Sequence, residues 1–245
     1  FPLFITALGL GVATGVVSLT ALQKRLPKEQ AFPVLVFAGG VSMFFGVSMS
    51  TFWLAALGIF GLGACAGAVY VLGFTLLQAA LSTVATLIVA IPAAVVIAGY
   101  RFPGRGLLRA LVLVPFVMPT VVVAAAFLAL IGPTGLLGVD LSGSIWGLVL
   151  AHMFLNLAVV IRVLGAALAT LDPDLENAAR LLGASRWQAW RRVTWPLVAP
   201  SVRAASAIVF LFCFTSFGVV QVLGDGQLRT LEVQIYRSTA YLLDL

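Results

Sequence analysis

The chain has 245 residues, of which 62% are hydrophobic and 9% are charged, and its formal net charge is +6. Soluble domains are usually about 45–50% apolar and about 25% charged, so this composition excludes an ordinary soluble domain. Several apolar runs reach the roughly 20 residues that a helix needs to cross a bilayer, without the period-2 alternation of transmembrane strands. The sequence therefore predicts an all-α membrane protein, a polytopic transmembrane helical bundle.

Six spans are expected in chain order. They are Leu3–Leu22, Ala31–Leu57, Val69–Ala98, Leu107–Ile131, Ser144–Leu164 and Val198–Leu223. The connections after spans one, three and five carry many lysines and arginines, whereas the loops Gly58–Ala68 and Gly132–Gly143 carry none. Because basic loops stay in the cytoplasm, this alternation predicts that the basic connections are cytoplasmic and that Phe1 is outside. The positive charge thus indicates orientation in the bilayer and not binding of nucleic acid.

A polar, basic segment, Leu175–Pro196, interrupts the apolar sequence between spans five and six. The sequence Asp172-Pro173-Asp174 favours a helix start, because Asp caps a helix, Pro suits its first position, and acidic residues there, including Glu176, complement the helix dipole. Gly183 permits the left-handed conformation that ends a helix.

A second short helix is expected directly after this glycine. Ser185 and Gln188 have the spacing of a capping box, and Trp187 and Trp190 then share one face of the helix. Pro196 is expected to end the helix before span six begins. The segment therefore predicts two short helices joined by a sharp bend, and the loop charges predict that it lies on the cytoplasmic side.

Two interpretations of this insert are open from the residues alone. Trp and Arg side chains suit an amphipathic helix pair that lies on the membrane surface. The small residues Ala178, Ala179 and Gly183 instead favour close approach by another protein. Arg162, near the cytoplasmic end of span five, is expected to extend its charge to the interface.

The insert resembles the EAA motif of the permeases of bacterial ABC importers, a superfamily with the MetI-like fold. The motif reads E-A-A-x-x-x-G, followed by an aromatic residue, an aliphatic residue and a proline. The matching positions here are Asn177, Ala178, Ala179, Gly183, Trp190, Val193 and Pro196. The acidic position of the motif holds Asn177, and Glu176 lies one residue earlier.

Beyond the insert, Tyr70–Leu245 is similar to the first half of the fused permeases for thiamine and ferric iron. The stretches that carry this similarity are RFPGRGLLRALVLVPFVMPTVVV, GLVLAHMFLNLAVVIRVLGAAL, IVFLFCFTSFGVVQVLGDG and TLEVQIYR. The expected organisation is two additional helices in residues 1–68 and an importer core in residues 69–245, with the coupling motif at 172–196. The chain is expected to continue beyond Leu245.

The resemblance implies a transport subunit of the bacterial inner membrane that is not an enzyme. The chain lacks a G-x-x-x-x-G-K-S/T loop, so ATP and Mg²⁺ would be bound by a cytoplasmic ATPase dimer. The coupling helix, about Pro173–Leu182, would contact that dimer. Other implied partners are a second permease half, an extracytoplasmic substrate-binding protein and the lipid bilayer. The implied coupling residues are Glu176, Asn177, Ala178, Ala179, Gly183, Trp190 and Pro196.

The resemblance implies thiamine or ferric iron as substrate, and the TLEVQIYR stretch favours thiamine. A permease for a polyamine, sulfate or sugar is an alternative, and a secondary transporter is another. A secondary transporter usually carries intramembrane charges for ion coupling, and the expected spans hold almost none. A membrane enzyme is disfavoured because paired carboxylates, a metal-ligand cluster and a nucleophile–His–acid set are all missing from the spans.

Candidate residues of the translocation path are few. Pro115 and Pro119 interrupt span four, as Pro92 interrupts span three, and such prolines shape a path or simply kink a helix. His152 and Asn156 lie four residues apart on one face of span five, where they line a pore or bond to a neighbouring helix.

Three further features carry expectations. The cysteines Cys65 and Cys213 are read as small core residues without a disulfide. The pairs Gly11/Gly15 and Gly63/Gly67 indicate close helix packing. The tail Asp225–Leu245 is amphipathic, with Leu231, Ile235 and Tyr236 opposite Glu232 and Arg237, and either meets the binding protein on the external side or lies in the interface.

Overall fold

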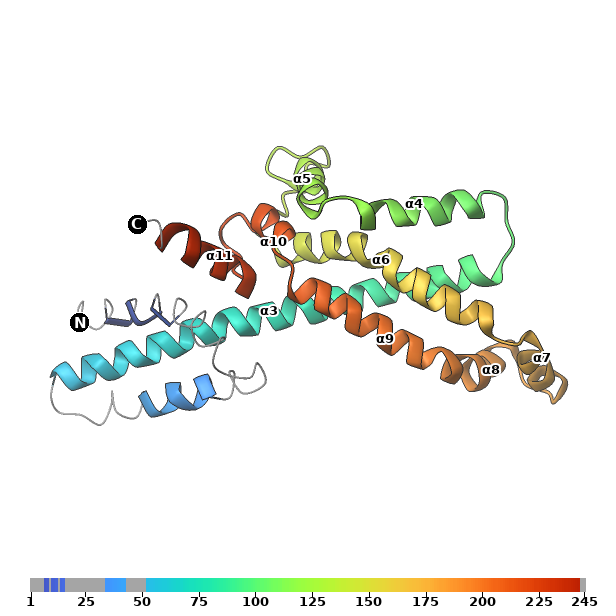
Figure 1. The fold of residues 1–245 in the computed structure, drawn as a ribbon, viewed down its shortest axis with the longest axis horizontal. Coiled ribbons are helices and arrows are strands. Elements are labelled where there is room, and N and C mark those ends of the chain that lie inside the picture. Colours follow the sequence, from blue (N-terminus) through green and yellow to red (C-terminus); the bar gives the residue numbers. More distant parts are fainter. Residues whose placement is uncertain (1–6, 9, 13, 16–33, 43–51, 243–245) are drawn as a thin grey trace. The chain divides into compact units, whose positions relative to one another are not determined.

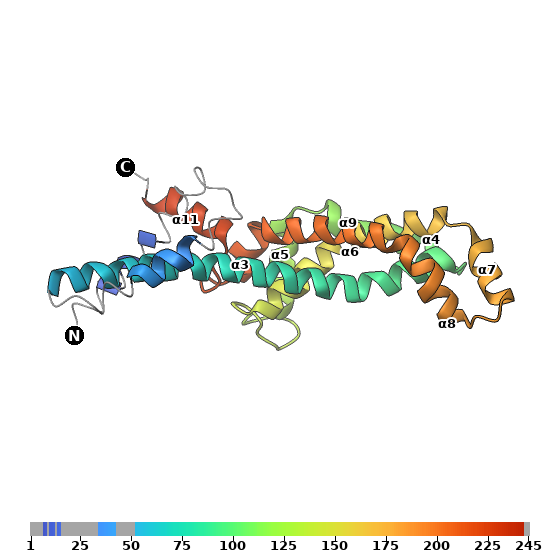
Figure 2. The same cartoon turned by 90° about the horizontal axis from the view of Figure 1, so that it is seen from below.

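The structure is a computed structural model that describes residues 7–8, 10–12, 14–15, 34–42 and 52–242, and the secondary structure assigned within these residues is helical (Figures 1 and 2). The chain divides into two compact units. One consists of Phe1–Leu77 with Arg229–Leu245, and the other is Gln78–Leu228. Helix α3 (Phe52–Gly99) contributes to both units.

Helix α3 runs without a break through 48 residues. The loop predicted at Gly58–Ala68 is therefore wrong. That stretch contains neither proline nor a charged residue, and glycine is common in membrane helices, so nothing in it ends a helix. Pro92 also lies inside α3 and does not interrupt it. At 1.5 Å per residue α3 is about 70 Å long, more than twice the roughly 30 Å hydrocarbon core of a bilayer.

In the first unit, the helical segment within residues 7–15 packs tightly against α3. A Cβ atom on Gly11 would collide with the backbone of Phe60, and one on Gly15 with the backbone of Ala64. Gly63 of α3 meets the backbone of Leu8 in the same way. The close packing predicted at Gly11, Gly15 and Gly63 is thus confirmed.

Helix α11 (Leu231–Leu242) also belongs to the first unit. Its backbone N–H at Leu231 donates a hydrogen bond to Thr75 Oγ1 of α3 at 3.0 Å. The buried residues Leu231, Gln234 and Ser238 recur at helical spacing, whereas Tyr236 is 44% exposed.

The second unit is built around α6 (Ile145–Thr170), which packs against the part of α3 in this unit and against several later helices. The later helices are α4 (Arg105–Val117), α5 (Thr120–Ile131), α9 (Trp195–Phe214) and α10 (Gly218–Leu223). Leu164, Val202 and Val209 are among the buried side chains of the resulting core. The insert follows α6 as α7 (Pro173–Leu181), α8 (Arg186–Ala189) and the π-helical turn η1 (Trp190–Thr194).

Two predicted spans are broken helices. Span four divides into α4 and α5, which meet at an angle of 104° (Figure 1). Met118 is extended there, because a residue before proline disfavours the helical conformation and Pro119 follows it. Span six divides into α9 and α10 between Phe214 and Gly218. Both predictions of continuous spans are therefore corrected.

Among the described residues, three helical stretches are long and apolar enough to cross a membrane. They are Ala55–Gly99, Ile145–Thr170 and Arg186–Phe214, and the bent pair α4–α5 is a fourth candidate. Predicted span one and residues 43–51 of span two lie largely or wholly outside the described residues.

Candidate functional site

The insert begins and bends where its capping residues predict. The Asp172 side chain accepts a hydrogen bond from the Asp174 N–H at 3.0 Å, and α7 starts at Pro173. The helix ends at Leu181, and Gly183 has φ of +90°, which is the left-handed conformation. The predicted first helix and its glycine bend are confirmed.

The second helix begins at the predicted capping box. Ser185 Oγ accepts from the Gln188 N–H at 3.3 Å, and the Gln188 side chain accepts from the Ser185 N–H at 2.9 Å. The rings of Trp187 and Trp190 stack with their centroids 5.2 Å apart, and Trp195 lies 5.5 Å from Trp190. The shared aromatic face predicted for this helix is confirmed.

Pro196 does not end this helix, contrary to the prediction. The chain stays helical from Arg186 to Phe214, so the insert leads directly into α9. In a regular α-helix the proline ring would clash with the carbonyl of Arg192, four residues earlier. The π-turn η1 widens the helix just before Pro196, with the Trp195 N–H bonded to the Trp190 carbonyl. We attribute the passage of the helix through Pro196 to this wider turn.

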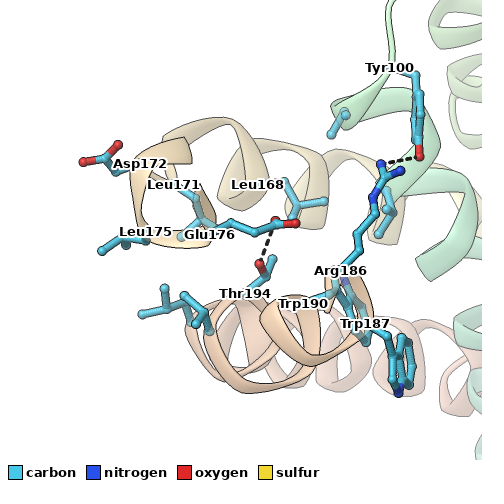
Figure 3. Close-up of a pocket in the computed structure, with 15 residues that line it drawn as sticks. Tyr100, Leu168, Leu171, Asp172, Leu175, Glu176, Arg186, Trp187, Trp190 and Thr194 are labelled. Atoms are coloured by element: carbon cyan, nitrogen blue, oxygen red, sulfur yellow. Dashed lines mark hydrogen bonds between the residues drawn. The ribbon is translucent and has the colours of Figure 1, made fainter. Parts of the chain in front are cut away.

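A pocket of about 740 Å³ lies between α7, the α8–η1 helix and the end of α3 (Figure 3). Inside it, Thr194 Oγ1 donates a hydrogen bond to Glu176 Oε2 at 3.3 Å. Thr194 is buried and Glu176 is half-buried, and this bond connects α7 to η1. The pocket combines this polar pair with the indole rings of Trp187 and Trp190.

A second contact connects α8 to the end of α3. Arg186 Nη2 donates to the Tyr100 hydroxyl at 2.9 Å, and the guanidinium lies 5.9 Å from the centre of the Tyr100 ring (Figure 3). Arg105 and Arg109 donate to the carbonyls of Ala98 and Ile97 at 3.1 and 3.4 Å. These arginines cap the C-terminus of α3 and bring the loop after α3 to the same end of the unit as the insert.

The outer surface of the insert exposes apolar side chains. Leu181 is 89% exposed and Leu182 is 90% exposed, at the end of α7 beside Gly183. Asn177 and Ala178 are also exposed, whereas Ala179 is half-buried. The sequence prediction did not include the two leucines, although the run Arg180-Leu-Leu-Gly before the bend was the signal for them.

A smaller pocket, of about 450 Å³, lies where the two broken spans meet α6. The predicted path residues His152 and Asn156 both line it. His152 Nε2 is 2.9 Å from Ser216 Oγ, and its Nδ1 is 3.3 Å from Ser82 Oγ. Pro119 forms the break between α4 and α5 beside this pocket, while Pro115 is buried inside α4.

Residues 90–243 match the family described as "Binding-protein-dependent transport system inner membrane component". This chain belongs to that family. The match begins in the second half of α3 and runs through α11, so it includes the insert and both broken spans. The family consists of transport subunits, which confirms a multi-pass membrane protein that is a transport subunit and not an enzyme.

Several relatives within this family are named for their solutes. The thiamine transport system permease protein ThiP of Brucella suis is 34% identical over 183 residues, which cover 70% of this chain and 34% of the relative. ThiP of Escherichia coli is 33% identical over the same shares. A probable molybdenum ABC transporter permease protein of Haloferax volcanii is 35% identical over 67% of this chain and 62% of its own length. The chain therefore spans about a third of the length of the thiamine permeases that it matches.

Proposed function

We propose that this chain is one half of the translocation unit of an ATP-driven importer. In this proposal a cytoplasmic ATPase dimer binds ATP and Mg²⁺ and contacts the insert, and an extracytoplasmic binding protein delivers the solute. The sequence carries one coupling motif, so a second permease half completes the unit. The matched residues cover only 34% of the Brucella suis thiamine permease, so that longer chain is long enough to contain a second permease half.

The observation that carries the proposal is the pair of exposed leucines at the end of α7. Leu181 and Leu182 expose 89% and 90% of their surfaces in a basic insert. Burial of these side chains against a partner protein would therefore give a favourable hydrophobic free energy. They lie at the end of α7 beside the Gly183 bend, and Figure 2 shows α7 and α8 at one end of the second unit. A cleft on an ATPase subunit is the partner that this surface suits. The coupling residues around them are Glu176, Asn177, Ala178, Ala179, Gly183, Trp190 and Pro196.

Thiamine is the proposed solute. Most of the named relatives are thiamine permeases, and they match this chain over 70% of its length. The molybdenum relative makes an oxyanion the second candidate.

The test of the proposal is co-purification and ATPase stimulation in the complete complex. The double variant Leu181→Ser/Leu182→Ser is expected to lose the ATPase subunits and the stimulation of ATP hydrolysis, while it still inserts into the membrane. The matched control is Leu136→Ser/Leu137→Ser, because these leucines are also adjacent and 85% and 65% exposed, but lie in the loop before α6. If the insert variant retains ATPase binding and stimulation, the proposed docking surface is wrong.

A further inference from the structure

The smaller pocket described above lies between two helix breaks inside the membrane-spanning part of the second unit. The α4–α5 break and the α9–α10 break both border it, and α6 supplies its third side. Discontinuous helices are tolerated at membrane depth where they line a cavity, and in transporters they commonly surround the solute site. His152 and Asn156 lie in the first half of α6, away from its ends, so the pocket borders the interior of a predicted membrane-spanning helix.

Aromatic rings from different segments gather around this pocket. Phe116 comes from α4, Phe212 from α9 and Phe217 from the break before α10. The rings of Phe116 and Phe212 lie 6.2 Å apart and are tilted by 39°. All three side chains remain more than one third exposed.

The polar groups of the pocket are buried and held in place. His152 is 1% exposed and Asn156 is 5% exposed. His152 lies between Ser216 Oγ and Ser82 Oγ, at 2.9 and 3.3 Å. The Asn156 Nδ2 group donates to the His152 carbonyl at 2.8 Å and contacts Cys213 Sγ at 3.6 Å. Both bonds use the amide nitrogen, so the side-chain carbonyl oxygen remains available to accept from a ligand.

The lining of this pocket carries no Asp, Glu, Lys or Arg. An oxyanion needs cationic side chains or several converging N–H donors, and this lining supplies neither a lysine nor an arginine. A flat heterocycle with a spread positive charge suits it better, because the faces of phenylalanine rings attract cations. The available oxygen of Asn156 and the hydroxyl of Ser216 suit the ring nitrogens and amino group of such a ligand.

We infer that this pocket, with the rings of Phe116, Phe212 and Phe217 around His152, Asn156 and Ser216, is a transient binding site for thiamine, an aromatic heterocyclic cation, during its passage. This inference rests on the proposed function and adds to it a location and a mode of recognition. The few polar groups and the absence of a counter-charge give weak binding. Weak binding suits a transport site, because the solute must leave as readily as it enters.

The experiment uses the complete importer in proteoliposomes, with saturating binding protein loaded with labelled thiamine. Phe212→Leu removes the aromatic face and keeps an apolar side chain of similar length. We expect the thiamine turnover of this variant to fall about tenfold, while the binding-protein-stimulated ATPase rate stays near that of the wild type. Phe212→Tyr keeps the ring and is expected to transport like the wild type.

The matched control is Phe154→Leu. Phe154 is 40% exposed, close to the exposure of Phe212, but its ring packs against Phe127 and does not line the pocket. This variant is expected to transport thiamine normally. If Phe212→Leu fails to assemble, Phe116→Leu provides the same measurement, because the Phe116 ring also lines the pocket.

Two failures are distinguishable. If the wild-type importer takes up thiamine and Phe212→Leu, or Phe116→Leu in its place, transports it equally well, the site is overturned and the proposed function stands. If the wild-type importer hydrolyses ATP with its binding protein but takes up no thiamine, both the proposed solute and this site are overturned.

Discussion

Glu176 and Thr194 join the coupling helix to the π-turn that leads into α9, through the hydrogen bond of 3.3 Å from Thr194 Oγ1 to Glu176 Oε2. This bond gives a structural role to Glu176, the acidic residue one position before the acidic position of the motif. Successive residues of a helix point about 100° apart, so an acid at 177 and an acid at 176 face different sides. Glu176 lines the pocket inside the insert, and Asn177 is exposed. The acid in this chain thus connects α7 to α9.

Replacing Thr194 with Val is expected to loosen this connection. Val has nearly the same shape as Thr but cannot donate, and the loss of a bond to a partly exposed carboxylate costs about 1 kcal/mol of stability. We expect α7 to remain helical, and the ratio of transported solute to hydrolysed ATP to fall several-fold. The measurement is paired uptake and phosphate release in proteoliposomes.

Thr170→Val is the control for that change. Thr170 Oγ1 bonds only to the carbonyl of Ala167 in its own helix and is exposed, so its loss leaves α7 and η1 connected. The proposed role of the Glu176–Thr194 bond is wrong if both variants transport and hydrolyse ATP in the same ratio.

Gly183→Ala tests the bend between the two insert helices. An Ala residue at φ of +90° is strained, at a cost of about 1–2 kcal/mol, although nothing lies within 4 Å of the added Cβ. The bend is expected to open and ATPase stimulation to weaken. Gly106→Ala, which also meets no atom within 4 Å but has a helical backbone, is expected to be neutral. Equal ATPase stimulation in both variants would show that the left-handed bend is not required.

The local structure of the insert could be predicted from the sequence, because its signals are short-range. Asp172, Gly183 and the pair Ser185 and Gln188 each act within a few residues of their own position. The same local reasoning failed at Pro196, since the effect of a proline depends on whether the preceding turn is α or π.

Features that depend on distant parts of the chain were not predictable in this way. The loop expected at Gly58–Ala68 separated two predicted spans, and a helix longer than the bilayer is thick makes that loop unnecessary. The aromatic pocket gathers Phe116, Phe212 and Phe217 across about a hundred positions of sequence, and only the two helix breaks bring them together.

The hydrogen bonds that Ser142 donates to Asp140, in the loop before α6, are expected to depend on pH. Hydrogen bonds from the hydroxyl and the N–H of Ser142, at 2.6 and 2.9 Å, lower the pKa of the Asp140 carboxyl from its ordinary value of 3.8. Because the folded pKa is lowered, the stabilisation is present above the ordinary value and is lost as the pH falls through the folded pKa. Hydrogen exchange of the Ser142 amide, corrected for intrinsic rate, is expected to lose protection as the pH is lowered below the ordinary carboxyl value of 3.8. Asp140→Asn should abolish this pH dependence, and a dependence that persists in the variant would contradict the assignment.

Gly63 and Gly73 give a matched test of helix packing, because both lie in α3 and in the first unit. A Cβ on Gly63 would collide with the backbone of Leu8 and lie 2.9 Å from the Val12 nitrogen, whereas a Cβ on Gly73 meets no atom within 4 Å. A clash with backbone cannot be relieved by a side-chain rotation, so Gly63→Ala is expected to destabilise the protein by about 1–3 kcal/mol. Gly73→Ala should be neutral or stabilise by up to about 1 kcal/mol, since Ala favours helix over Gly. Thermal unfolding in detergent compares the two variants, and equal midpoints would contradict the tight contact between α3 and the segment that holds Leu8.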